Sequence, residues 1–300
     1  MKLYMAGLYT NNVDIGGNIY RRLTEVEQKD RREVRYNLES YHYLKSQPSL
    51  DRVRKDGTKL FMDSGAFSAF TSGVDIDLKE YCNYLHKNED IIEVASVLDG
   101  IGDPLKTYQN QLAMEQLGTK PLPCYHYGED ERYLDYYIAN YEYITIGGMV
   151  PISTPQLRVW LDRIWNDHLI DGSGRPKVKV HGFGLTVPKL MYRYPWYSVD
   201  SSSWVQAAAN GLIVLPWNGV KFTVSAASPA RKKENVHVDN IPESQREALS
   251  KRIESYGYTV ERLRVDYLSR WIFNCMAFTV LNDDINSKEG IFIEDQMRLF

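Results

Sequence analysis

The sequence is poor in cysteine and has no long apolar run. The first shortage argues against disulfide-rich and zinc-cysteine proteins, and the second against membrane-spanning proteins. The three cysteines lie far apart and form no CxxC pair, which argues against a disulfide framework and against a zinc-cysteine motif. No apolar run reaches the roughly 18 residues that cross a membrane, so we expect no membrane partner. The opening MKLYMAGLYTNN lacks the apolar core of a signal peptide, so the cytoplasm is the expected location.

Short motifs of several enzyme classes are missing as well. The sequence contains no HExxH, no GxGxxG, no P-loop and no GxSxG. The usual signals for a zinc peptidase, a dinucleotide-binding fold, a nucleoside triphosphatase and a serine hydrolase are therefore absent. We expect neither a metal site nor a cofactor.

The composition is that of a globular chain. Hydrophobic residues make up 43% of the 300 residues and charged residues 25%, which suffices for a sizeable core. The length allows one large domain or two modest ones, and α/β barrels often run this long as a single unit. The formal net charge of -3 is a weak argument against nucleic acid as a partner.

Short apolar or aromatic runs recur along the first two thirds of the chain and predict strands. They are Leu3–Leu8, Arg35–Tyr41, Leu60–Gly65, Ile92–Asp99, Leu122–Gly128, Tyr143–Met149, Val178–Gly184 and Tyr197–Ser201. Several segments between them carry helix signals, such as the Asp-Pro pair at Asp103. This alternation predicts an α/β fold with a TIM-like (β/α)8 barrel over residues 1–211. An open doubly wound sheet is the alternative.

The pattern changes after residue 211. Leu212–Trp217 and Lys221–Ala226 predict a hairpin, because Asn218-Gly219 between them is a favoured hairpin turn. Pro242–Tyr256 and Val260–Leu281 predict two helices. We expect residues 212–300 to form a C-terminal extension packed on the barrel.

The predicted strand ends carry polar residues, and active sites of barrels lie at the C-terminal ends of their strands. These ends hold Asp63, Asp99, His126, Gly147-Gly148, His181-Gly182 and Asp200. In a barrel they would meet at one mouth. Each also has an ordinary structural interpretation: the two aspartates at 63 and 200 as caps, the one at 99 as a solvated loop residue, and each histidine as a core residue.

These residue types favour chemistry at a glycosyl bond. Paired carboxylates such as Asp63 and Asp200 serve such reactions as nucleophile and acid/base. Asp99 suits the N1-H and exocyclic amine of guanine, and backbone amides at Gly147-Gly148 suit a carbonyl oxygen. The small turn at Ser64-Gly65-Ala66 lets a flat ligand approach, and the ring of Phe67 suits stacking on it.

Five segments, in order, resemble the tRNA-guanine transglycosylase superfamily. FMDSGAFS is similar to its DSGG(F/Y)Q signature, VLDGIGDP to its guanine-reading strand end, ITIGGMVP to IGGLAVG, VHGFGL to LMGVG, and YSVDSSSW to the strand carrying the nucleophile. The family's CxCxxC…H zinc site is absent, and SSSW replaces its Arg-rich stretch. This combination most resembles the phage-type, DpdA-like DNA 7-deazaguanine transglycosylases.

The resemblance implies a role for each matching residue. Asp200 falls on the nucleophile and Asp63 on the acid/base. The implied base-binding residues are Asp99, Phe67, Ser64, His126, Gly147, Gly148, Met149, His181 and Gly182. The implied activity is base exchange in DNA, with a 7-deazaguanine such as preQ0 as substrate and no metal or redox cofactor. For a phage protein, the implied location is the host bacterial cytoplasm.

Two basic stretches without acidic residues flank Asp200 in the sequence and suggest contacts to phosphates. The candidate nucleic-acid-binding residues are Lys189, Arg193, Arg231, Lys232 and Lys233. A solvated basic surface is the alternative interpretation. Exchange on tRNA, a nucleoside or glycoside hydrolase with the same Asp pair, and a non-catalytic binding subunit remain open as alternative functions.

Overall fold

The computed structural model describes residues 1–232 and 237–287, which group into two compact units. The first unit contains Met1–Asn11 and Tyr36–Ser201, and the second contains Asn12–Arg35 and Ser202–Ser287. This division differs from the boundary expected after residue 211. The segment between the first two strands and the residues directly after the eighth strand group with the C-terminal elements.

The first unit is built on a sheet of eight parallel strands. They are β1 (Lys2–Ala6), β2 (Tyr36–Ser40), β3 (Leu60–Asp63), β4 (Ile92–Ala95), β5 (Cys124–His126), β6 (Tyr143–Gly147), β7 (Lys179–Gly182) and β8 (Ser198–Ser201). Each apolar run of the sequence overlaps one of them, and every run but the first contains its strand whole. The fold-class prediction is confirmed at this level, because all the strand pairs of this sheet are parallel.

The strand order is β4-β3-β2-β1-β8-β7-β6-β5, so the first strand pairs with the eighth, as in a sheet that curls back on itself. A doubly wound sheet would instead reverse its order at a switch point. The edge strands β4 and β5 are joined beyond their ends by a parallel bridge between Ser96 and Leu122. Within the described residues the sheet is therefore curled and compatible with a TIM-like fold, but regular strand pairing does not close it into a barrel.

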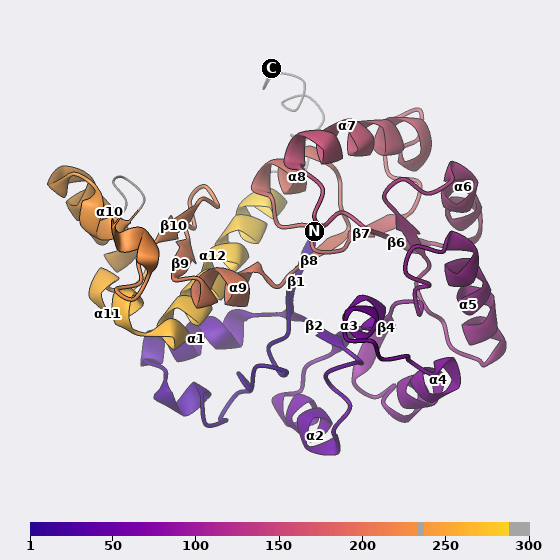
Figure 1. The fold of residues 1–300 in the computed structure, drawn as a ribbon, viewed down its shortest axis with the longest axis horizontal. Helices are drawn as coiled ribbons and strands as arrows, with labels where there is room; N and C mark the ends of the chain where they lie inside the picture. Colours follow the sequence, from indigo (N-terminus) through magenta and orange to yellow (C-terminus); the bar gives the residue numbers. More distant parts are fainter. Residues whose placement is uncertain (233–236, 288–300) are drawn as a thin grey trace. The chain divides into compact units, whose positions relative to one another are not determined.

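Helices α2, α4, α5, α6 and α7 lie around the outer side of this sheet (Figure 1). The first unit contains α2 (Gln47–Asp56), α3 (Ala66–Thr71), α4 (Leu78–Lys87), α5 (Pro104–Gln116), α6 (Glu131–Asn140), α7 (Thr154–Ile164), the π-helix η2 (Trp165–Leu169) and α8 (Pro188–Arg193). Asp103 caps α5 as expected, since its Oδ1 accepts a hydrogen bond from the Lys106 backbone N–H at 3.0 Å. Tyr4, Leu38 and Phe61 form a buried cluster on the strands.

The second unit is mostly helical. It contains η1 (Tyr20–Arg22), α1 (Glu25–Glu33), α9 (Ser203–Ala209), β9 (Leu212–Val214), β10 (Lys221–Thr223), η3 (Pro229–Lys232), η4 (Val238–Asn240), α10 (Glu243–Glu254), α11 (Val260–Val265) and α12 (Tyr267–Ser287). The predicted hairpin is confirmed, because β9 and β10 pair antiparallel. The prediction of one helix over Val260–Leu281 is wrong. Asp266 is extended, and its Oδ1 accepts from the Leu268 N–H at 2.9 Å, which starts a new helix there.

An apolar core and a partly buried ion pair stabilise the second unit. Arg262 donates from Nε and Nη2 to the Glu27 carboxylate at 2.7 and 2.8 Å. Burial opposes the charge of Glu27, but these hydrogen bonds outweigh it and lower the pKa of that carboxyl. The core includes Ile213, Ile253 and Phe273. Among the residues that the structure describes, no helix has the length and apolar character needed to span a membrane.

Candidate active site

Three carboxylates lie at or just beyond the C-terminal ends of strands of the sheet. Asp63 is the last residue of β3, Asp200 lies in β8, and Asp99 follows β4. The negative charges of Asp99 and Asp200 both act on Asp63, which places each of them within electrostatic range of that carboxyl. The convergence expected from the strand ends is thus present for these residues.

A tight turn fixes the carboxylate of Asp63. Its Oδ2 accepts from the Gly65 N–H at 3.0 Å, and its Oδ1 accepts from the Ser96 hydroxyl at 3.3 Å. Gly65 has a φ of 74°, and a Cβ there would lie 2.6 Å from the Cβ of His42, so the turn requires glycine. Oδ2 of Asp63 therefore has the structural role of a turn cap. That role does not account for the protonation state of the carboxyl.

The pKa of Asp63 lies near neutrality. Burial, followed by the negative charges of Asp99 and Asp200, raises the pKa of this carboxyl to about 7, although the hydrogen bonds from Gly65 and Ser96 lower it. A group with a pKa close to the working pH both donates and accepts protons efficiently. Asp63 therefore suits the role of acid and base.

The loop after β4 is held on both sides of Asp99 by helix α5. Asn110 donates to the Leu98 carbonyl at 2.6 Å, and Thr107 accepts from the Gly100 N–H at 3.0 Å. Asp99 Oδ2 lies 3.2 Å from His126 Nε2, whereas its Oδ1 is buried without a hydrogen-bond partner. An unpaired buried acceptor costs stability. Asp99 is therefore not a solvated loop residue, and one of its oxygens can accept from a ligand.

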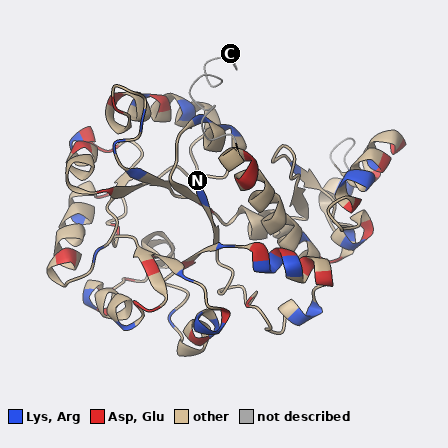
Figure 2. Cartoon of the chain, turned by 180° about the vertical axis from the view of Figure 1, so that it is seen from behind, with Lys and Arg blue, Asp and Glu red and all other residues tan. Residues whose placement is uncertain are grey.

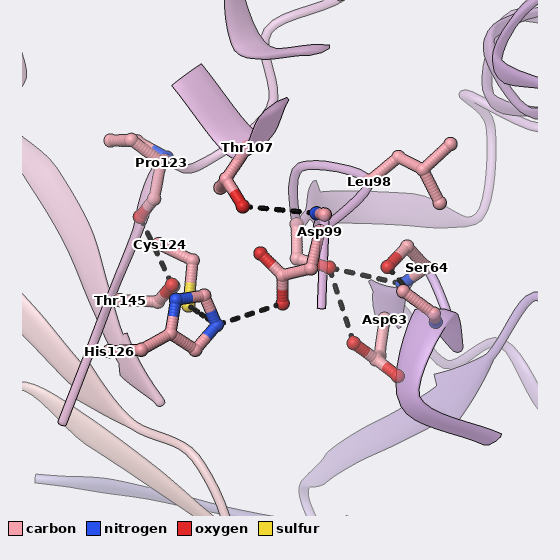
Figure 3. Close-up of polar contacts among 12 residues, drawn as sticks. Asp63, Ser64, Leu98, Asp99, Thr107, Pro123, Cys124, His126 and Thr145 are labelled. Atoms are coloured by element: carbon pink, nitrogen blue, oxygen red, sulfur yellow. Dashed lines mark hydrogen bonds and ion pairs between the residues drawn. The ribbon is translucent and has the colours of Figure 1, made fainter. Parts of the chain in front are cut away.

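His126 lies at the centre of a polar cluster, which we call the His126 cluster: Asp99, Cys124, His126 and Glu129. Figure 3 shows the first three of these residues. His126 Nε2 lies 3.2 Å from Asp99 Oδ2 and 3.4 Å from Cys124 Sγ, and its Nδ1 lies 2.9 Å from Glu129 Oε1. Burial lowers the pKa of His126, but Cys124 and Asp99 outweigh it and raise that pKa well above its usual range. Burial raises the pKa of the Cys124 thiol to about 11, so it is not an activated nucleophile.

The glycine pair at the end of β6 packs against the His126 cluster. A Cβ at Gly147 would lie 3.0 Å from His126 Cδ2 and 3.1 Å from Cys124 Sγ. Gly148 is exposed and has a φ of 69°, and Met149 is buried. The first glycine therefore makes room for the cluster, while the expected contact of this segment with a base stays a prediction.

Asp200 is oriented by two neighbours in β7 and its following loop. The Gly184 N–H donates to Asp200 Oδ1 at 2.7 Å, and His181 Nε2 lies 3.4 Å from the same oxygen. His181 Nδ1 lies 2.7 Å from Ser198 Oγ, which is 2.6 Å from the Tyr143 hydroxyl. These contacts give Asp200 a fixed position, and they differ from those of a helix N-cap.

His181 lies beneath the site. It is fully buried, and burial lowers its pKa against the attraction of Asp200, so its ring is neutral. The ring centroid lies 4.6 Å from those of Phe61 and of Phe183. A ring without exposed surface offers no face to a base. The expectation that His181 walls a base slot is therefore not supported by its burial, and its observed place is that of a support for Asp200.

The remaining base-site candidates divide into exposed and structural residues. Phe67 is 66% exposed on α3, which leaves its ring available for stacking. Ser64 is buried, and its N–H donates to Ser96 Oγ at 3.0 Å. A Cβ at Gly182 would lie 3.0 Å from the Trp196 ring. Ser64 and Gly182 thus have structural roles next to the site, the first through a hydrogen bond and the second through close packing.

The basic candidates of the first unit differ in their surroundings. Lys189 is exposed on α8. Arg193 donates from Nε and Nη2 to the Asp162 carboxylate at 2.7 and 2.9 Å, a bidentate pair that competes with a phosphate. Figure 2 shows basic and acidic residues interspersed along the outer helices. Lys189 is the better candidate for a nucleic-acid contact.

The basic candidates of the second unit lie around η3. Arg231 donates from Nε to Asp239 Oδ2 at 2.8 Å, and Lys232 is exposed. Lys233 lies outside the described residues. A contact of these side chains with nucleic acid stays a prediction.

Sequence reasoning missed Cys124, Glu129 and Gly184 as neighbours of the site. A signal existed for the first, because Cys-x-His on a strand places both side chains on one face. Glu129 and Gly184 lie in loops whose course the sequence pattern does not determine.

Comparison with known proteins leaves the function to be inferred from this geometry. No protein-family model matches the chain, and no curated protein matches it.

Proposed function

We propose that the protein exchanges guanine in DNA for a 7-deazaguanine base, through a covalent bond between Asp200 and the sugar. The observation that carries the proposal is the grouping of three carboxylates at the C-terminal ends of strands, of which Asp63 has its pKa raised to about 7 by burial and by the other two. A base-exchange reaction needs a nucleophile, an acid/base group and a group that reads the base. Asp200, Asp63 and Asp99 supply these in turn.

The proposal includes closure of the curled sheet as a TIM-like (β/α)8 barrel. The pairing of β1 with β8 and the bridge from Ser96 to Leu122 favour it. Two backbone hydrogen bonds support the bridge, from Val97 N–H to the Leu122 carbonyl at 3.0 Å and from Leu122 N–H to the Ala95 carbonyl at 2.8 Å. Sites of such barrels lie at the strand ends that hold the carboxylates.

In the first half-reaction Asp200 attacks C1′ of a deoxyguanosine that has left the base stack. The C1′–N9 bond breaks, and Asp63 in its protonated form assists the departure of the base by giving it a proton. The Gly184 N–H at 2.7 Å holds Oδ1 of Asp200, which directs the carboxylate for attack. The product is a glycosyl ester on Asp200 and free guanine.

In the second half-reaction a 7-deazaguanine base replaces guanine. Asp63, now ionised, takes the proton from N9, and the nitrogen attacks C1′ and releases Asp200. Two displacements retain the configuration at C1′. Each step conserves protons, because Asp63 returns to the state in which it began.

The base is recognised through Asp99 and Phe67. Asp99 Oδ1, which is buried without a partner, accepts from N1-H or the exocyclic amine of a guanine-like base. Phe67, 66% exposed, stacks on the ring. A base without these donors would leave the carboxylate unpaired, which gives the preference for guanine-like bases.

The test is incubation of the full chain with DNA and with tRNA, each with labelled preQ0 and labelled guanine, followed by nucleoside mass analysis. We expect label in DNA, and an Asp200→Ala variant with a rate lower by a factor of at least about 10³. Asp75→Asn, an exposed aspartate, is the control and should retain the wild-type rate.

The outcomes separate the alternative functions. Label in tRNA alone assigns the activity to tRNA. Release of free base without incorporation assigns a hydrolase. Wild-type exchange by Asp200→Ala contradicts the nucleophile, and absence of exchange on both polymers contradicts the proposal.

A further inference from the structure

We propose that Asp99, Cys124 and His126 form a binding site for a divalent metal ion of the zinc class. One ligand atom from each of these side chains lies within 4.8 Å of the others. They come from the loop after β4 and from β5, so elements of the sheet position all three. The inference is independent of base exchange, because it concerns the ligand atoms alone.

Two of the three separations between the ligand atoms match those of a tetrahedral zinc site. With Zn–N and Zn–O near 2.0 Å and Zn–S near 2.3 Å, tetrahedral angles put N and O about 3.3 Å apart and N and S about 3.5 Å apart. His126 Nε2 lies 3.2 Å from Asp99 Oδ2 and 3.4 Å from Cys124 Sγ. Two edges of the tetrahedron are therefore already in place.

Glu129 supplies the support that a metal-binding histidine usually has. Its Oε1 lies 2.9 Å from His126 Nδ1, and its Oε2 accepts from the His126 backbone N–H at 3.0 Å. A carboxylate on the far ring nitrogen fixes the tautomer with Nδ1 protonated, so that the Nε2 lone pair points at the ion. Glu129 thus orients the ligand and does not bind the ion.

The types of the three ligands favour one class of metal ion, and the neighbouring Gly147 adds no side chain to the site. Thiolate and imidazole with one carboxylate suit Zn²⁺ better than Mg²⁺ or Ca²⁺, which take oxygen ligands. Gly147 brings no side chain against Cys124 and His126, where a Cβ would lie 3.1 and 3.0 Å away. Three protein ligands leave a fourth position for water or substrate. On binding the ion, Cys124 gives up its thiol proton and the His126 imidazolium gives up its Nε2 proton, both to solvent.

Asp99 can serve this site and the proposed base recognition together. Its Oδ2 faces His126, and its Oδ1 is the buried oxygen without a partner. A metal on Oδ2 therefore leaves Oδ1 for a base, and neither proposal requires the other.

The test is titration of the chelator-treated full chain with Co²⁺, followed by its absorption spectrum. We expect one equivalent to produce a thiolate-to-cobalt charge-transfer band, which Zn²⁺ then displaces. Cys124→Ser should abolish the band, and Cys82→Ser, also a buried cysteine, should retain it. No band in the wild type, or a band that Cys124→Ser retains or Cys82→Ser abolishes, overturns the proposal.

Glu129→Gln gives a second measurement that needs no change to a ligand. We expect it to keep the band and to weaken Co²⁺ binding by about 10- to 100-fold, because the histidine loses its carboxylate support. If Glu129→Gln binds Co²⁺ as tightly as the wild type, His126 is not a metal ligand supported by Glu129. Base exchange, measured separately by nucleoside mass analysis, can fail while the cobalt band is present, so failure of the two proposals is distinguishable.

Discussion

Asp63 and Asp200 are aspartates of one site in different surroundings. Asp63 sits in a desolvated turn beside two other carboxylates, and its pKa is raised to about 7. Asp200 instead receives a backbone N–H from Gly184 and lies above the neutral ring of His181. When one carboxyl of a pair is tuned to hold a proton, it is the candidate for acid/base and the other for nucleophile. The environments thus favour the assignment that the sequence resemblance implies.

The raised pKa of Asp63 predicts a pH-dependent cost to stability. The unfolded carboxyl titrates near 3.8 and the folded one near 7, so the folded state binds the extra proton and stability falls as pH rises between these values. Asp63→Asn cannot ionise. The free energy of unfolding of Asp63→Asn, relative to that of the wild type, should therefore increase by on the order of 1–3 kcal/mol between pH 5 and pH 8.

Urea unfolding of both proteins at the two pH values measures this gain. Asp75→Asn, on an exposed residue, is the control and should change by less than about 0.5 kcal/mol over the same interval. A gain of zero for Asp63→Asn, or a loss, would show that the carboxyl ionises as easily in the folded protein as in the unfolded chain.

The sequence located the carboxylates of the site but not the contacts that hold them. Asp63, Asp99 and Asp200 are predictable because each follows an apolar run whose C-terminal end must lie at one edge of a parallel sheet. The place of His181 beneath Asp200 was not predictable. Which face of β7 turns inward depends on the stagger of β7 against β8, where His181 pairs with Ser198.

At the scale of elements, the C-terminal ends of β5 and β6 pack so closely that there is no room for a side chain at Gly147. Gly147 pairs with His126, and a Cβ on it would lie 3.1 Å from Cys124 Sγ. Gly147→Ala should therefore destabilise the protein by about 1–3 kcal/mol through overpacking. The measurement is the midpoint and slope of urea unfolding.

Two variants make that prediction specific. Gly172→Ala adds a methyl where no atom lies within 4 Å and should cost less than about 0.5 kcal/mol. Cys124→Ala should recover part of the loss when combined with Gly147→Ala, because it removes the contacted sulfur. If Gly147→Ala and Gly172→Ala lower the free energy of unfolding equally, the contact of residue 147 with Cys124 and His126 does not restrict the side chain there.

The elements themselves were predictable where pattern and local signals agree. Every apolar run became a strand, and Asp103-Pro104 begins α5 as expected. The break at Asp266 was missed, because the helical spacing of apolar residues continues through it while its side chain caps the next helix. The contribution of Asn12–Arg35 to the second unit was missed too, since contacts such as Glu27 with Arg262 join residues far apart in the chain.

At the scale of the whole molecule, the net charge of -3 does not decide whether DNA binds. Two candidate arginines are already paired, Arg193 with Asp162 and Arg231 with Asp239. Phosphate binding depends on cations that are not neutralised by neighbours and that lie at the correct end of the fold. The exposed Lys189 meets the second condition by topology.

Topology places Lys189 and Lys87 at opposite ends of the first unit. Helices that return between parallel strands run against them, so a helix begins near the C-terminal strand ends and finishes at the other end. Lys189 is the second residue of α8 and lies at the site's end, whereas Lys87 is the last residue of α4. Both side chains are exposed, which makes them a matched pair.

Lys189→Glu should therefore weaken DNA binding and reduce the slope of log affinity against log salt by about 1, since one phosphate contact is lost. Lys87→Glu makes the same change in net charge and should alter neither quantity by a comparable amount. Fluorescence anisotropy with one labelled duplex, over a series of salt concentrations, gives both slopes. If the two variants behave alike, binding responds to total charge, and DNA does not approach the strand ends that hold Asp63, Asp99 and Asp200.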